Sequence, residues 1–180
     1  DAAAATLALE PRVDALYPAV LLPGRARNGD AVVVQCLGRC LVGPLLEDVE
    51  GVLRVSTLRI ERAMVVADRR VLVLDCEQLA ASALRGLPAF KKLIDLMQRH
   101  YPETVSSIIV VNSPLLVWAA YKTVKPWLDP TTAAKVQLFS WRDAEGAFAA
   151  LSALMEPGVA PSRYGGAGDG LATARLDALC

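Results

Sequence analysis

The hydrophobic positions along the chain follow two patterns, short apolar runs and longer stretches with a helical period. Buried strands are indicated by four short runs, at 31–37, 71–74, 107–111 and 135–139. Helices are indicated where apolar residues recur three and four positions apart, at 53–66, 88–99 and 141–155. Because strands and helices alternate along the chain, we expect an α/β fold in which helices cover the sheet.

A stretch without charged residues, 104–121, has nearly the length of a membrane-spanning helix. Its middle contains Asn112, Ser113 and Pro114, which are typical of a turn and interrupt the apolar run. We therefore expect a buried strand followed by a helix that begins at Pro114, rather than a transmembrane span.

The segment 114–128 is apolar on nearly every side. Its apolar residues cannot share one helix face: Leu115, Leu116, Val117, Trp118, Tyr121, Val124, Trp127 and Leu128. Such a helix is either buried on all sides in the core, or it is a lid with one face on a lipid-filled cavity and the other at a membrane surface. The residues alone leave both interpretations open.

Composition limits the classes of function. The 180 residues are 54% hydrophobic and 21% charged, which excludes a disordered chain and favours a single domain. The 19 basic and 19 acidic residues balance, so the chain lacks the excess positive charge of a nucleic-acid-binding protein. The cysteines at 36, 40, 76 and 180 are too few and too unevenly placed for a disulfide scaffold, and we expect reduced thiols in a cytoplasmic protein.

No catalytic motif is complete. Gly24 and Gly29 have the spacing of a phosphate-binding loop, but Asp30 stands where such a loop needs a lysine. His100, the one histidine, closes a predicted helix beside Arg99, which favours a structural role for its charge. We expect no enzymatic activity, no cofactor and no metal site.

Four motifs in the second half of the chain resemble, in order and spacing, the CRAL-TRIO or Sec14-like lipid-binding domains: His100-Tyr101-Pro102-Glu103, 108–114, 125–132 and Lys135-Val136. Weaker matches flank them at Asp75 and at Pro161-x-x-Tyr164-Gly-Gly. The resemblance covers about residues 15–168, which leaves 1–14 as an N-terminal stub and 169–180 as a C-terminal extension. The chain departs from the family at Ala31 and Gln78, and its link before residue 71 is short.

The resemblance implies a mixed, mostly parallel sheet that forms the floor of an apolar lipid cavity, with helices around it and a mobile gate helix. The family's head-group positions match Glu103, Thr132 and Lys135, whose carboxylate, hydroxyl and ammonium groups suit an inositol phosphate. The gate and cavity positions match Leu115, Leu116, Trp118, Ala119, Tyr121, Val124, Trp127 and Leu128. Positions that bind phosphatidylcholine in the family match Arg70 and Leu72, which argues against a strong choline-lipid site.

The function implied is the binding of a single phospholipid, with phosphatidylinositol favoured, and its transfer or presentation between membranes. The implied partners are that lipid and a transient membrane surface, for a monomeric cytoplasmic protein. Two alternatives remain open. One keeps the fold and gives it a small hydrophobic ligand, similar to tocopherol or a retinoid. The other is a lipid-sensing regulatory or scaffold module of a larger protein.

Overall fold

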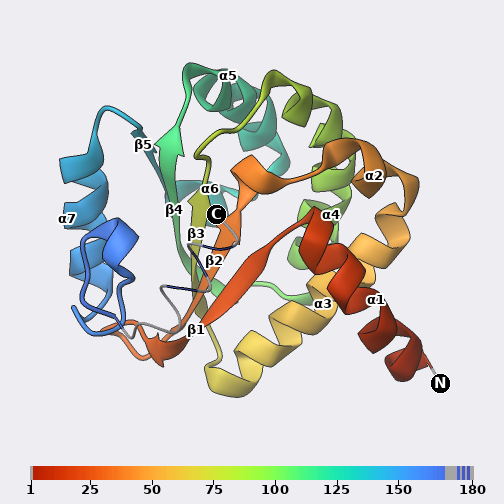
Figure 1. Cartoon of the computed structure of the whole chain (residues 1–180), viewed down its shortest axis with the longest axis horizontal. Helices are drawn as coiled ribbons and strands as arrows, with labels where there is room; N and C mark the ends of the chain where they lie inside the picture. The colour runs from red at the N-terminus through yellow and green to blue at the C-terminus, as the bar shows by residue number, and fades with distance from the viewer. Residues whose placement is uncertain (1, 169–173, 175, 177, 179–180) are drawn as a thin grey trace.

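Within the residues that the structure describes, which are 2–168, 174, 176 and 178 of this computed structural model, a five-stranded sheet forms the centre (Figure 1). The strands lie across the sheet in chain order: β1 (Ala19–Arg25), β2 (Ala31–Cys36), β3 (Arg70–Asp75), β4 (Val105–Ser113) and β5 (Val136–Ser140). β1 is antiparallel to β2, and β2 to β5 run parallel. The expected α/β fold with a mixed, mostly parallel sheet is confirmed.

The connections between the parallel strands lie on one face of the sheet. Because crossovers between parallel strands are right-handed and the strand order follows the chain, each connection returns over the same face. This face carries α2 (Val42–Glu47), α3 (Val49–Val66), α4 (Leu87–His100), α5 (Leu115–Val124) and α6 (Pro130–Ala134). α7 (Ala144–Leu154) follows β5 and covers the opposite face, on the left of Figure 1. Short 3-10 turns complete the connections: η1 (Leu37–Arg39), η2 (Ala81–Gly86), η3 (Lys125–Trp127) and η4 (Ser162–Tyr164).

Two helices begin at aspartates that cap them, away from the predicted starts. The Asp48 carboxylate accepts a hydrogen bond of 2.9 Å from the Gly51 amide, so α3 begins at Val49 instead of residue 53. The Asp143 carboxylate accepts one of 3.1 Å from the Gly146 amide, so α7 begins at Ala144 and the prediction of a helix from residue 141 is wrong.

The hydrophobic pattern does not predict β1. Its residues Pro23 and Gly24 are typical of a turn, and only Val20 and Leu22 in it are buried. The register shifts between Leu21 and Arg25, which fits the tolerance of an edge strand for a proline that cannot donate to the ladder. Because only two positions of this edge strand are buried, its alternation of apolar and polar residues is too short to be recognised in the sequence.

α1 (Ala2–Leu16) packs against α3 at the start of the chain. Val13 lies in a hydrophobic cluster with Val55, and Asp14 forms an ion pair with Arg59. The boundary predicted between residues 1–14 and 15–168 therefore falls inside a continuous helix. The division into a stub, a domain and an extension stays a prediction.

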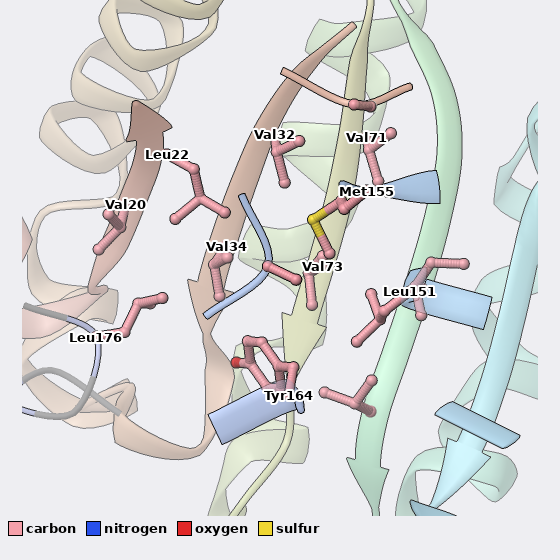
Figure 2. Close-up of a cluster of buried hydrophobic side chains, with 14 of the residues drawn as sticks. Val20, Leu22, Val32, Val34, Val71, Val73, Leu151, Met155, Tyr164 and Leu176 are labelled. Atoms are coloured by element: carbon pink, nitrogen blue, oxygen red, sulfur yellow. The ribbon is translucent and has the colours of Figure 1, made fainter. Parts of the chain in front are cut away.

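The face of the sheet beneath α7 is a dense core (Figure 2). Alternate residues of β2, β3 and β4 point into it, as the period of two along a strand requires: Val32, Val34, Val71, Val73, Ile109 and Val111. Leu151 of α7 and Met155 pack against them, and both are fully buried. Leu176 is buried in the same cluster, although most of the predicted extension 169–180 lies outside the described residues.

Asp75, buried at the end of β3, holds the C-terminal motif to the sheet. Its carboxylate accepts hydrogen bonds of 2.7 Å from the Tyr164 hydroxyl and 2.9 Å from the Asn112 amide, and Arg163 approaches it to 3.4 Å. Burial, followed by the charge of Asp75, raises the pKa of Tyr164 well above its ordinary value, so the phenol stays protonated and remains the donor. Two motifs 89 positions apart in the chain thus meet at one carboxylate.

The cysteines differ in state. Cys36, buried at the end of β2, is disulfide-bonded, whereas Cys40 and Cys76 are free thiols. The expectation of reduced thiols is therefore wrong for Cys36.

Leu151→Ala is expected to lower the free energy of unfolding by about 2–5 kcal/mol, because it leaves a cavity in the dense core. Urea denaturation followed by circular dichroism measures this change. The matched control is Leu115→Ala, the same substitution at a residue that is 85% exposed, with an expected change below about 0.5 kcal/mol. Equal losses in both variants would contradict the placement of the core beneath α7.

Candidate functional site

An apolar cavity of about 570 Å³ lies on the helix-covered face of the sheet, opposite α7. Its floor consists of the strand residues that alternate with those of the dense core: Val33, Leu72, Leu74, Ile108, Val110 and Leu138. The volume lies within the range of about 300–1,000 Å³ in which proteins hold small-molecule ligands. One face of the sheet therefore carries the dense core, and the other carries the cavity beside a smaller buried cluster that includes Val33, Ala63 and Leu72.

α3 and α4 form two walls of the cavity. The lining side chains of α3 include Val52, Leu53 and Ile60, and those of α4 include Phe90, Leu93, Ile94 and Met97. The α4 stripe has the spacing that predicts an amphipathic helix, and Lys91 and Lys92 lie on its exposed side.

α5 forms the third wall and has two apolar sides. Of the eight predicted gate residues, four line the cavity: Leu116, Tyr121, Val124 and Leu128. The remaining predicted residues, Leu115, Trp118, Ala119 and Trp127, are not among the lining residues, and the first two are 85% and 43% exposed. Within α5 only Val124 is buried, so the alternative of a helix enclosed on all sides is wrong.

Val117 and Ala120 also line the cavity, although neither is among the predicted gate residues. With Tyr121 and Val124 they repeat the spacing of three, four and seven residues, which is the signal that identifies the inner side. Among the described residues, no helix combines the length and the apolar character needed to cross a bilayer.

The predicted head-group residues gather at the amino ends of β4 and β5. Glu103 lies two residues before β4 in a left-handed backbone conformation (φ 57°), and it is among the residues that line the cavity. Thr132 in α6 also lines the cavity. Lys135 immediately precedes β5, and its ammonium group donates a hydrogen bond of 2.7 Å to the carbonyl oxygen of Val105. Lys135 itself is not among the lining residues, so the structure brings three residues to one corner but only two to the cavity.

Comparison with known proteins identifies the family. A sequence model of the CRAL/TRIO domain matches residues 17–166. The chain belongs to the CRAL/TRIO family. Proteins of this family bind lipid ligands, so the chain is a lipid-binding domain.

The individual relatives match over short stretches. The chain is 43% identical over 42 residues to the phosphatidylinositol transfer protein PDR17 of Saccharomyces cerevisiae, an alignment that covers 23% of this chain and 12% of the relative. It is 33% identical over 76 residues to the CRAL-TRIO domain-containing protein YKL091C of the same yeast, covering 42% and 24% of the two chains. The crystal structure of Sfh5 shares the fold, with a TM-score of 0.60 at 20% identity over 71% of this chain and 50% of that one.

In this CRAL/TRIO domain, side chains fasten both ends of α5. The Trp118 indole donates a hydrogen bond of 3.1 Å to the Ser113 hydroxyl at the end of β4. Beyond α5, the amide of Gln98 in α4 donates to the Trp127 carbonyl at 3.0 Å and accepts from the Asp129 backbone N–H at 2.6 Å. The Ser113 hydroxyl thus holds the first turn of α5. Gln98 holds the segment that follows α5 with two hydrogen bonds.

Asp129 caps the short helix α6 that carries Thr132. Its carboxylate accepts a hydrogen bond of 2.8 Å from the Thr132 amide. Hydrogen bonds from Thr132, first that of its side chain, lower the pKa of Asp129, and the charge of Lys135 adds a smaller effect in the same direction. Because the folded pKa lies below the unfolded one, this cap contributes its stability at neutral pH and loses it as the pH falls through the folded value.

Three polar atoms of the cavity wall lack a hydrogen-bond partner within the described part of the chain. They are the Ser56 hydroxyl, one terminal nitrogen of Arg59 and one of Arg70. The sequence analysis considered Arg70 only as a residue that does not fit the family's phosphatidylcholine position. It named neither Ser56 nor Arg59. Ser56 and Arg59 are three residues apart on α3, which places both on the side that faces the sheet.

Gln98→Met is expected to speed hydrogen exchange at the Asp129 amide about fivefold to tenfold, because the loss of one hydrogen bond corresponds to about 1 kcal/mol of local stability. Exchange followed by mass spectrometry of peptides measures it. Gln137→Met, at an exposed position of β5, is the matched control. Unchanged exchange at residue 129 would show that the glutamine does not hold the segment that follows α5.

The thiols of Cys40 and Cys76, which line the cavity, are expected to be alkylated slowly. Burial, the largest effect, raises the pKa of both to about 12, so the thiolate fraction at pH 8 falls roughly a thousandfold below that of an exposed cysteine. Iodoacetamide labelling, followed by peptide mass spectrometry, should give a rate that rises about tenfold per pH unit from pH 8 to 10. Labelling as fast as in urea would contradict the burial of these thiols.

Proposed function

We propose that this protein binds one phospholipid in its apolar cavity and exchanges it with membranes, with phosphatidylinositol as the preferred lipid. The observation that carries the proposal is the cavity itself, which is lined by apolar side chains and walled by the short helix α5. The similarity to PDR17, a phosphatidylinositol transfer protein, supports the choice of lipid.

The energetics favour exchange over permanent storage. Each buried CH₂ group is worth about 0.8 kcal/mol relative to water, so a diacyl lipid cannot escape through water at a useful rate. Relative to a bilayer, an apolar cavity gains almost nothing for each CH₂ group. The two environments are therefore nearly balanced for the acyl chains, and polar contacts to the head group select the lipid.

The outer side of α5 supports contact with a membrane. Leu115 and Trp118 are exposed there, next to the exposed Lys122. Tryptophan favours the boundary between head groups and acyl chains, and a lysine favours anionic lipid. A net charge of +0 leaves no strong attraction to hold the protein at the surface after exchange. We accordingly propose a monomer that binds membranes transiently.

The head group is assigned to Glu103, Thr132 and Lys135. The Thr132 hydroxyl can donate to a phosphate oxygen and Glu103 can accept from inositol hydroxyls, and both line the cavity. Lys135 must exchange its hydrogen bond with the Val105 carbonyl for one with the phosphate, which is favourable because a charged acceptor binds an ammonium more strongly than a neutral one.

The experiment is lipid extraction from the purified protein, with mass spectrometry of the extract, followed by transfer of fluorescent phosphatidylinositol between vesicles. Lys135→Ala is expected to slow transfer about tenfold or more, since a lost charged hydrogen bond corresponds to about 1.5–3 kcal/mol. Lys91→Ala, at an exposed lysine of α4, is the matched control.

The extracted molecule separates the outcomes. Bound phosphatidylinositol together with a slow Lys135→Ala variant supports the proposal. A small apolar molecule in the extract would replace it with a carrier for that ligand. No lipid in the extract and no transfer by the unmodified protein would refute both transfer and storage.

A further inference from the structure

The first residue of β3, Arg70, places a guanidinium group inside the cavity wall. It is 2% exposed and lies on the same side of β3 as Leu72 and Leu74, which form the apolar floor. One terminal nitrogen donates a hydrogen bond of 3.0 Å to the Thr104 hydroxyl. The other terminal nitrogen is buried and has no partner among the described residues.

No carboxylate of the described residues forms an ion pair with Arg70, which distinguishes it from two other largely buried arginines. Arg59 pairs with Asp14, and Arg163 pairs with Asp75 and Glu77. A buried cation without a counter-charge is strongly unfavourable in a protein interior. Burial lowers the pKa of Arg70 to about 10, which still leaves the guanidinium charged at neutral pH.

The neighbours of Arg70 belong to the proposed head-group corner. Arg70 pairs in register with Val105, whose carbonyl receives the Lys135 ammonium, and Thr104 follows Glu103 directly. The unpartnered nitrogen of Arg70 therefore lies at the same end of the sheet as the head-group residues, in a residue that lines the cavity. Because this nitrogen is covered by protein, an acid group reaches it when the guanidinium turns toward the cavity. An acid group that reached this depth would meet a donor that is already desolvated.

We propose that Arg70 binds the acid group, phosphate or carboxylate, of a ligand whose hydrocarbon chain fills the cavity. This inference rests on the proposed lipid-binding function of the cavity and adds to it a second, interior contact that selects anionic over neutral amphiphiles. The acid oxygen accepts the hydrogen bond that the free terminal nitrogen of Arg70 lacks, and its charge compensates the buried cation.

The test compares three ligands with the same oleoyl chain on delipidated protein at pH 7.5: oleate, oleoyl lysophosphatidic acid and monooleoylglycerol. Displacement of a fluorescent apolar probe, below the micelle concentrations, gives each affinity. The unmodified protein is expected to bind at least one of the two acids at least tenfold more tightly than the neutral ester. The tighter acid shows whether the group is a carboxylate or a phosphate.

In Arg70→Gln the preference for the acid is expected to fall below twofold, while the affinity for monooleoylglycerol stays within twofold of the unmodified protein. Arg54→Gln, at an exposed arginine of α3, is the matched control and should keep the full preference. A preference that survives in Arg70→Gln, or that is absent from the unmodified protein, overturns the proposal.

Arg70→Met provides a readout if the glutamine variant does not fold. Removal of an uncompensated buried charge is expected to raise the Tm of the lipid-free protein, and oleate and monooleoylglycerol should then stabilise the variant equally. A larger increase in the Tm of this variant with oleate than with monooleoylglycerol overturns the proposal. Failure of vesicle transfer would refute the proposed lipid exchange but would leave the acid preference of Arg70 intact, so the two results are separable.

Discussion

Crossovers between parallel strands turn in the right-handed sense, and here the strand order follows the chain, so the connections from β2 through β5 all return over one face of the sheet. That face receives α3, α4 and α5, whereas the other face is left for the segment after β5, which begins with α7. The floor of the cavity and the dense core are consequently made by alternate residues of the same strands. Val33 and Leu72 face the side of the cavity, and Val34 and Val73 face the dense core.

This division separates two requirements that conflict in a single core. A close-packed interior provides stability, whereas a ligand site needs unfilled space. The α7 side holds the sheet rigid, and the carboxylate of Asp75 ties the C-terminal motif to it through Tyr164. The opposite side carries the cavity together with a smaller core cluster, in which Val33 and Leu72 pack with Ala63 of α3.

The sequence predicted the elements that repeat a clear period. The strand at β4, the stripe of α4 and the motifs around Glu103 are local signals, and the α/β fold and family follow from them. β1 was not predicted because Pro23 and Gly24 are typical of a turn and only two of its positions are buried. The capping aspartates lie outside the apolar period, so the hydrophobic pattern misplaced the helix starts.

The site was predictable only in part, because a residue's surroundings depend on distant segments. The inner side of α5 follows from the spacing of Val117, Ala120 and Val124 once the direction of the cavity is known. No local pattern indicates that Arg70 has no ion-pair partner among the described residues, since this depends on side chains from distant segments of the chain. The position of Lys135 beside the Val105 carbonyl likewise arises from the pairing of β4 and β5.

The bond between the Trp118 indole and the Ser113 hydroxyl has an optical consequence. Ser113 also donates 2.8 Å to the Phe139 carbonyl, so a single hydroxyl joins α5 to the ends of β4 and β5. In the proposed lipid exchange, outward movement of α5 breaks this contact and transfers a half-exposed indole to a new solvent environment. Trp118 is therefore a natural fluorophore whose emission reports the proposed movement of α5 without a synthetic label, once Trp127 and Trp141 are replaced.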